Sequence, residues 1–333
     1  FDIGFSLIDY DGSYSYARAF LVGLLNTLLV SVIGILIATL IGVTIGIGRL
    51  SSNFLVAKFS EVYVEVFRNI PLLLQLFFWY FAALRALPLP ENAINFYDIS
   101  YLTVKGWYVP KFIWNNFSIF LYSIIAAIVA IVFVSRYAKK QREEVGRHIP
   151  TFYFGIGLLF VIPALSFLIG GVTLEFEIPV LEQMSTTIFN FRGGVSIIPE
   201  LMSLALALSM YTATFIAENV RAGIIGIGKG QKEAAASIGL NNTQILKLVV
   251  LPQALRIIIP PTTNQYLNLT KNSSLAAAIA YPDLVLVFAG TALMQTGRAI
   301  EIVSITMGTY LFLSLSISFF MNWYNQSVAI KEK

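Results

Sequence analysis

The sequence feature that most constrains the fold is a run from Ala19 to Gly48 that contains no charged residue. Such a run can cross a membrane, because the hydrocarbon is about 30 Å thick and a helix rises about 1.5 Å per residue. Of the 333 residues, 57% are hydrophobic and only 12% are charged, whereas about 25% are charged in soluble domains. We therefore expect an all-α integral membrane protein.

We predict about seven transmembrane helices in the given sequence. Two of the predicted spans are interrupted: Phe54 to Leu84 by charged residues, and Val249 to Leu269 by the pair Pro260-Pro261, after which we expect the helix to break. The segment Ala276 to Ala289 is apolar but too short for a crossing, so we expect it to insert only partly. The uninterrupted spans are Ala19 to Gly48, Phe112 to Val134, Thr151 to Gly171, Ile198 to Ala217 and Ile302 to Ile330.

Charged loops predict the orientation. Basic residues crowd the loop RYAKKQREEVGRH at 136–148 and the segment 221–247, whereas VTLEFEIPVLEQ at 172–183 is acidic. Because cytoplasmic loops carry the excess of lysine and arginine, the first two should be cytoplasmic. Seven crossings then place the first residues outside and the closing IKEK inside.

Composition excludes several classes of protein and site. The chain has no cysteine, which excludes disulfides and thiolate chemistry. The single histidine, His148, lies in a charged loop, and we interpret it as a solvated residue and not as a metal ligand. The net charge of +4 is spread over loops, which does not suit a nucleic-acid binder. The opening FDIGFSLIDY lacks the basic segment of a signal peptide.

One stretch nearly matches the phosphate-binding loop of an ATPase. Residues Gly223 to Gly230 follow the pattern G-x-x-x-x-G-K, but Gly230 stands where a hydroxyl residue would hold Mg²⁺. The preceding SLALALSMYTATFIAENVRA has the length of a membrane helix, whereas a phosphate loop follows a strand. We therefore expect no nucleotide to bind here.

The segment 230–248 instead predicts two short helices joined by a tight turn. KGQKEAAASI favours a helix, Gly239 can end it, and Asn241 or Asn242 can cap a second helix that returns to the membrane at Leu251-Pro252. The three consecutive alanines leave a bare helix surface over which the groove of another protein can close.

The spacing within this segment resembles the E-A-A-x3-G-x9-I-x-L-P signature of the transmembrane subunits of ABC importers, with Val249 in the isoleucine position. The resemblance implies a type I importer bundle in which 230–248 is the cytoplasmic coupling helix that docks into an ATP-binding subunit. It also implies that the chain itself holds no cofactor, since ATP and Mg²⁺ belong to the partner subunits. The coupling residues carried over are Gly230, Gln231, Glu233, Ala234, Ala235, Gly239, Leu251 and Pro252.

Further stretches resemble the permeases of polar amino acids, the group for histidine, glutamate, glutamine, arginine and opines. EVFRNIPLLLQLFF at 65–78 resembles their R-x-x-P-L-L-x-Q run, and ATFIAENVRAGI and LPQALRIIIPPTTNQYLNLTKNSSLAAAIAYPDL are similar to the same group. The resemblance covers Ala19 to Leu84 and Ile198 to Val328. The residues between, 85–197, form an insertion with two extra spans within a single permease domain, 1–333. This insertion is similar to that of the larger permease of general L-amino acid uptake systems, which also has a further N-terminal span upstream.

The resemblance implies a function without chemistry. The chain would be the permease subunit of an ATP-driven, binding-protein-dependent importer of polar L-amino acids in the bacterial inner membrane. Its expected partners are ATP-binding cassette subunits, a sister permease in a heterodimer, an extracytoplasmic binding protein and membrane lipid, and no nucleic acid.

Polar residues inside predicted spans are candidates for the substrate path, because such groups are costly in hydrocarbon unless they are paired or line water. Hydrogen bonds between helices would use the same residues structurally. Glu61, Glu65 and Arg68, like Glu218 and Arg221, are spaced for ion pairs along one helix. The path candidates are Gln75, Asn264, Gln265, Asn268, Lys271 and Asn272.

Two other classes of function remain as alternatives. An ion-coupled secondary transporter would show an inverted internal repeat, which we do not find, and would leave the coupling signature unexplained. A membrane enzyme would need a convergent catalytic or metal-binding set, which the sequence does not offer. The sequence does not say which amino acids are carried.

Overall fold

A computed structural model describes residues 5–145, 150–185 and 188–328. His148, Gly146 of the basic loop and the closing IKEK lie outside these residues. The chain divides into two units, one formed by Phe1–Leu87, Val104–Gly106 and Ile197–Lys333, the other by Pro88–Thr103 and Trp107–Ser196.

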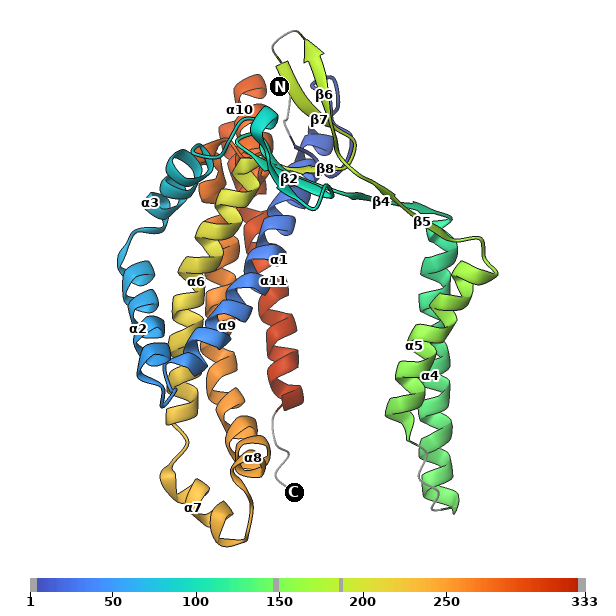
Figure 1. The fold of residues 1–333 in the computed structure, drawn as a ribbon, viewed down its shortest axis with the longest axis vertical. Helices are drawn as coiled ribbons and strands as arrows, with labels where there is room; N and C mark the ends of the chain where they lie inside the picture. Colours follow the sequence, from blue (N-terminus) through green and yellow to red (C-terminus); the bar gives the residue numbers. More distant parts are fainter. Residues whose placement is uncertain (1–4, 146–149, 186–187, 329–333) are drawn as a thin grey trace. The chain divides into compact units, whose positions relative to one another are not determined.

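The first unit is a helical bundle (Figure 1). Five helices of the described chain are long and apolar enough to cross a membrane, or six if the bent pair at Phe54–Leu84 is one span. The seventh predicted span is the shorter apolar helix α5, given below. The helical elements of the first unit are α1 (Tyr16–Gly48), α2 (Phe54–Asn69), α3 (Leu72–Phe77), a π-helical turn (Phe78–Leu84), α6 (Pro199–Ile225), α7 (Lys229–Ser237), α8 (Asn242–Ile245), a second π-helical turn (Leu246–Val250), α9 (Leu251–Asn272), a 3₁₀ segment (Ser273–Ile279), a third π-helical turn (Leu284–Gly290), α10 (Thr291–Thr296) and α11 (Ala299–Val328).

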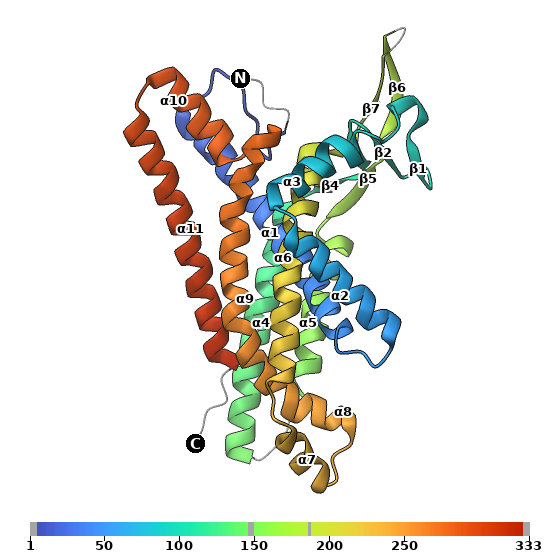
Figure 2. The same ribbon diagram turned by 90° about the vertical axis from the view of Figure 1, so that its left-hand side faces the viewer.

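Small residues bring α1 and α6 together, and the two helices lie side by side in Figures 1 and 2. A Cβ atom added at Gly42 would lie 2.7 Å from the Cβ atom of Ile216, and one at Gly46 would lie 2.7 Å from the carbonyl oxygen of Ala217. Glycines four residues apart allow such close packing between membrane helices, where contact area replaces the hydrophobic effect. The bundle core therefore lies along this seam.

The other end of α1 is fastened by buried polar groups. Asn26 donates from Nδ2 to the carbonyl oxygen of Pro282 at 2.8 Å, and the amide of Leu284 donates to Oγ1 of Thr27 at 3.0 Å. The hydroxyl of Tyr281 donates to the carbonyl oxygen of Asn26 at 3.2 Å. Asn26, Thr27 and Tyr281 are fully buried. We call this set of contacts the polar anchor.

The predicted span Phe54 to Leu84 is not one straight helix. It bends by 103° between α2 and α3. Ile70, which precedes Pro71, is extended with φ −94° and ψ 128°, as the ring of a following proline requires. Gln75 is buried at this bend and donates from Nε2 to the carbonyl oxygens of Phe67 at 2.7 Å and Ile70 at 2.9 Å.

The expected helix break at Pro260-Pro261 is wrong, because α9 continues through both residues to Asn272. Each proline removes one backbone donor, but membrane helices tolerate proline where neighbouring helices or side chains satisfy the freed backbone groups. The α-helix ends instead where the 3₁₀ segment Ser273–Ile279 begins, and Ala280 closes that segment with a left-handed φ of 59°.

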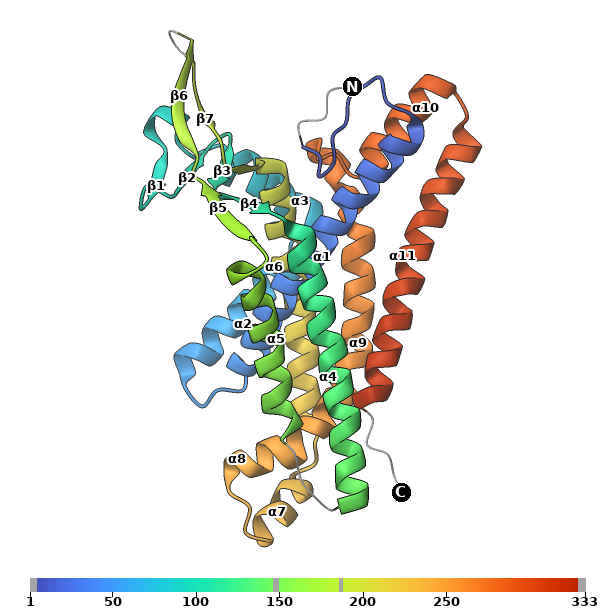
Figure 3. The ribbon, with the colours of Figure 1, turned by 90° about the vertical axis from the view of Figure 1, so that its right-hand side faces the viewer.

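The second unit combines strands with an antiparallel pair of helices, α4 and α5 (Figure 3). The predicted span Phe112 to Val134 begins too early, since Phe112 belongs to a strand and α4 begins at Phe117. Asn116, with a φ of 58°, separates the two elements. This unit contains α4 (Phe117–Val145), α5 (Thr151–Leu168), a 3₁₀ turn (Pro90–Asn92), β1 (Ile94–Phe96), β2 (Ser100–Thr103), β3 (Gly106–Val109), β4 (Lys111–Asn115), β5 (Thr173–Glu177), β6 (Val180–Ser185), β7 (Ile188–Arg192) and β8 (Val195–Ile197).

These strands form three small sheets. One has the order β1-β2-β3-β8, and the others are the pairs β4-β5 and β6-β7. In the antiparallel pair β4-β5, Lys111 lies opposite Glu177 and Asn115 opposite Thr173, so the pair joins the start of α4 to the end of α5. The sequence reasoning predicted none of these strands.

Candidate functional site: the coupling segment

The predicted coupling segment forms a hook at one end of the bundle, beyond α6 and α9 (Figure 2). We use hook for residues 227–254. Five residues form its small core: Ile227, Ala235, Ile245, Val250 and Ala254. Ala235 is only 5% exposed, so the middle alanine of the series faces this core. Ala234 and Ala236 are exposed.

A tight turn after α7 reverses the chain. Gly239 has a φ of +87°, a conformation that side chains with a Cβ atom rarely adopt. The Gly239 amide donates to the carbonyl oxygen of Ala236 at 2.9 Å, and the Leu240 amide donates to that of Ala235 at 3.3 Å. This bonding pattern is a Schellman ending, which satisfies carbonyls that a helix terminus otherwise leaves unpaired. The structure thus confirms the predicted turn at Gly239.

The helix that follows begins with reciprocal caps. Oδ1 of Asn241 accepts from the Gln244 amide at 2.9 Å, and Oε1 of Gln244 accepts from the Asn241 amide at 2.9 Å. The predicted cap is therefore Asn241. The chain then passes through the π-helical turn Leu246–Val250 into α9, whose first residues are Leu251 and Pro252.

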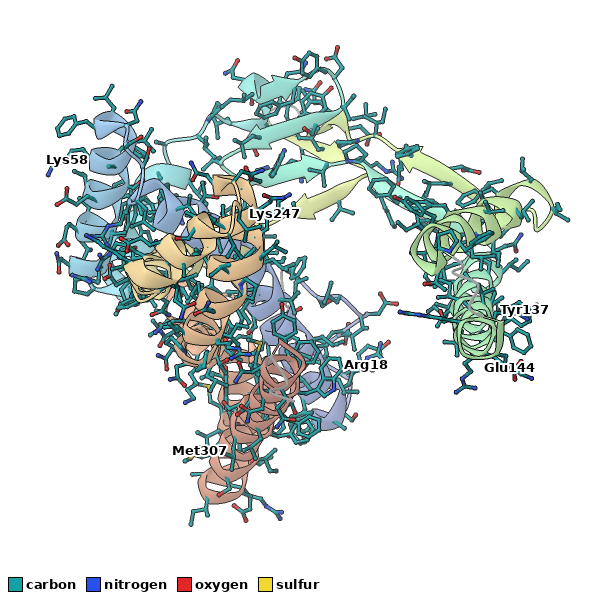
Figure 4. All side chains as sticks on the ribbon, turned by 90° about the horizontal axis from the view of Figure 1, so that it is seen from below. Arg18, Lys58, Tyr137, Glu144, Lys247 and Met307 are labelled. Carbon is teal, nitrogen blue, oxygen red and sulfur yellow. The ribbon has the colours of Figure 1, made fainter. Side chains whose placement is uncertain are left out.

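Most of the other predicted coupling residues lie on the surface of the hook. Gly230, Gln231 and Glu233 are exposed on α7, Leu251 is 44% exposed, and Pro252 is half-buried. Lys247, in the second π-helical turn, also belongs to the hook, and Figure 4 labels it in the view from this end of the bundle. A cavity of about 380 Å³ lies between α7 and α8, with Glu233 and Ala236 on one wall and Leu246 on the other.

The stretch that resembles a phosphate loop has no such geometry. Gly223 lies inside α6, which continues to Ile225, and Gly228 is the residue before α7. A phosphate loop follows a β-strand, and here a 27-residue helix precedes it. The stretch is the connection from α6 to the hook.

The path candidates fall into two groups. Gln75 is occupied with the carbonyls of the α2-α3 bend, which is a structural use of its amide. Asn264, Asn268 and Lys271 are spaced by four and three residues, so they share one face of α9, and all three are exposed in the single chain. Gln265 and Asn272 are half-buried and lie at the edge of the same face, three residues before and four residues after Asn268.

Ion pairs link the helices next to the hook. The predicted pairs within one helix are present: Arg221 Nε donates to Glu218 Oε2 at 3.2 Å, and Arg68 lies 3.6 Å from Glu65. Glu61 pairs with Lys58 instead, at 2.9 Å, and the Lys58 side chain points outward in Figure 4. Arg49 at the end of α1 also pairs with Glu218, a link between helices that the sequence reasoning missed.

The chain is similar in sequence to a family of transport proteins and to several of its members. Residues 143–330 match the family of the binding-protein-dependent transport system inner membrane component. The chain is 51% identical to the general L-amino acid transport system permease protein AapQ of Rhizobium johnstonii, covering 100% of this chain and 82% of the relative. It is 49% identical to the putative amino-acid ABC transporter permease protein YhdX of Escherichia coli K12, covering 98% of this chain and 82% of the relative.

Two further comparisons add to this. The chain is 39% identical to the glutamate/glutamine/aspartate/asparagine transport system permease protein BztB of Rhodobacter capsulatus, covering 100% of this chain and 84% of the relative. Among solved structures, an amino acid ABC transporter crystallised with histidines matches with a TM-score of 0.53 at 19% identity, over 96% of this chain and 99% of the other. That likeness concerns the fold. With its apolar helices and its hook, the chain belongs to the family of inner membrane components of binding-protein-dependent transport systems.

Proposed function

We propose that the chain is the permease subunit of an ATP-driven importer that moves polar L-amino acids into the cytoplasm. The observation that carries this proposal is the hook, a capped and sharply turned pair of helices that projects from a membrane bundle. The names of AapQ, YhdX and BztB support amino acids as the cargo. Which amino acids are carried depends on a binding protein that delivers them.

The hook is the proposed docking element for an ATP-binding subunit. Because Ala235 is used inside the hook, the docking surface consists of the exposed side of α7, with Gln231, Glu233 and Ala234. ATP and Mg²⁺ are held by that partner, and this chain supplies no group for hydrolysis. A rigid hook passes the movement of the partner directly to α6 and α9, between which it is inserted.

A sister permease and an extracytoplasmic binding protein complete the proposed assembly. The face of α9 with Asn264, Asn268 and Lys271 points away from the core of this chain. Polar groups on the free face of a membrane helix are costly unless they meet water or another polar surface. This supports a path for a zwitterion between two permease subunits, with amide oxygens as acceptors for its ammonium and Lys271 as a donor for its carboxylate.

The decisive experiment reconstitutes the complete importer in proteoliposomes with purified binding protein. Uptake should require ATP inside the vesicles and should persist when ion gradients are collapsed. Uptake driven by an ion gradient without ATP would support a secondary transporter instead. The isolated chain should not bind ATP, and Lys229→Ala should transport nearly as well as the wild type, whereas a phosphate-loop lysine would be essential.

Variants of the free α9 face test the path. Asn268→Ala and Lys271→Ala should slow uptake or change the order of preference among competing amino acids, while the amount of assembled complex stays constant. Asn322→Ala is the control for Asn268→Ala, because Asn322 is an exposed asparagine of α11 outside this face, and it should change neither quantity. Normal uptake rates and a normal order of amino acid preference in both variants would show that Asn268 and Lys271 do not line the path.

A further inference from the structure

A second cavity lies at the end of α6 that is remote from the hook. Its volume is about 350 Å³, and its walls include Tyr80 of the first π-helical turn, Arg85 directly after that turn, Lys105, and Glu200 in the first turn of α6. A helix of 27 residues is about 40 Å long. The cavity is therefore separate from the coupling segment, and none of the path candidates on α9 lines it.

Opposite charges meet at one wall of this cavity. The hydroxyl of Tyr80 donates to Oε1 of Glu200 at 2.8 Å. The guanidinium carbon of Arg85 lies 5.6 Å from the centroid of the Tyr80 ring. One phenol ring thus stands between a carboxylate and a guanidinium.

This combination of charges selects the class of ligand. A site for a simple anion would not place a carboxylate beside two cations, and a site for a simple cation would not include Arg85 and Lys105. A ligand that carries a positive and a negative group a short distance apart can interact with the carboxylate of Glu200 and with the cations at the same time. The volume lies at the small end of the roughly 300–1,000 Å³ range of small-molecule sites, which suits a single amino acid and not a peptide.

We propose that this cavity binds the zwitterionic head of a free α-amino acid, with Glu200 accepting from its ammonium group and Arg85 donating to its carboxylate. Arginine suits the second role because its planar fork matches the two carboxylate oxygens. The proposal rests on the proposed function, since the ligand is the cargo of the importer. The cavity is then a first station for the amino acid before it reaches α9.

The hydrogen bond between Tyr80 and Glu200 also joins the first π-helical turn to α6. The variants must therefore remove the charge that binds the ligand without breaking this contact between the two elements. Glu200→Gln keeps a carbonyl oxygen that can accept from Tyr80 and removes only the charge. Arg85→Met removes an exposed guanidinium that contacts Tyr80 but is not a partner in the hydrogen bond between Tyr80 and Glu200. Arg192→Met is the control, because Arg192 is an exposed arginine of β7 whose ion-pair partner is Glu182.

The experiment uses the complete transporter in nanodiscs without binding protein. The probe is the radiolabelled amino acid that the wild-type importer takes up fastest. Two competitors are used: its analogue without the ammonium group and its amide without the carboxylate. The wild type should bind the probe and prefer it to both analogues, and each cavity variant should bind it about tenfold or more weakly, since hydrogen bonds to charged groups are lost. Both cavity variants should also raise the KM for uptake, and the control should match the wild type.

Normal binding and a normal KM in Glu200→Gln and Arg85→Met would overturn the inference while leaving the proposed function intact. Equal binding of the probe and the two analogues would overturn it as well. If the wild-type importer takes up no amino acid, the proposed function itself fails. Should Glu200→Gln not assemble, Arg85→Met decides the question, because it removes no atom of the hydrogen bond between Tyr80 and Glu200.

Discussion

Substitutions at Gly239 test the hook most directly. The residue has a φ of +87°, and no heavy atom lies within 4 Å of a Cβ atom built there. A side chain therefore meets no neighbour, and the whole penalty comes from the backbone. A left-handed residue costs about 1–2 kcal/mol for alanine, less for asparagine, and more for a β-branched residue such as valine.

These energies convert into populations of the formed hook. Since about 1.4 kcal/mol is a factor of ten, Gly239→Ala should shift the equilibrium away from the hook by roughly five- to thirtyfold. Gly239→Val should shift it further, and Gly239→Asn should shift it least. The penalty falls on one turn of the chain, so all three variants should insert in the membrane normally.

The assay measures binding of the purified ATP-binding subunit to the permease in nanodiscs and the ATPase activity stimulated by loaded binding protein. Both should fall in the order Gly, Asn, Ala, Val. Gly228→Ala is the control, because Gly228 is also without neighbours but has a φ of −54°, which alanine adopts freely. Equal binding and equal stimulated ATPase activity with Gly, Asn, Ala and Val at position 239 would refute the reasoning. A loss in Gly228→Ala as large as that in Gly239→Ala would refute it as well.

Three further predictions concern other parts of the chain. Ala235→Asp should unfold the hook and abolish docking of the ATP-binding subunit, because it buries an unpaired carboxylate in the hook core. Ala234→Asp should leave the hook folded, because Ala234 is exposed. Protease resistance of the hook measures the difference, and equal resistance in the two variants would contradict the assigned faces. Gly46→Leu should prevent α1 from packing on α6 and reduce the yield of folded protein in detergent, whereas the exposed Gly308→Leu should not. A cysteine at Gly146 should react with impermeant thiol reagents only from the cytoplasm, and one at Glu177 only from outside; the reverse would invert the orientation.

Structural features that depend on residues close together in the sequence were predictable. The span Ala19 to Gly48 became α1 because hydrocarbon tolerates no other backbone structure of that length. The turn and cap of the hook were predictable because Gly239 and Asn241 act within one helical turn. The docking face was less predictable, since only the folded hook shows that Ala235 faces inward.

Features that depend on distant residues were not predictable. The strands β4 and β5 pair Lys111 with Glu177, and no local pattern in the sequence indicates that partner. The ion pair of Arg49 with Glu218 joins residues 169 positions apart. The close contact of α1 with α6 did leave a signal, Gly42 and Gly46 four residues apart, which sequence reasoning could have used. Arg85 and Glu200, two of the charged groups of the second cavity, come together only through the fold.

The polar anchor sets the order in which the protein can be completed during synthesis. Asn26 and Pro282 are 256 residues apart, which at about 5–20 residues per second corresponds to roughly 13–50 s of translation. Throughout this time α1 must remain in the membrane while the Asn26 side-chain amide has only one of its two backbone acceptors, the carbonyl oxygen of Phe5 at 3.2 Å. Helix α1 is thus among the last helices to complete its native contacts, and any nascent chain that ends before Pro282 still lacks this acceptor for Asn26.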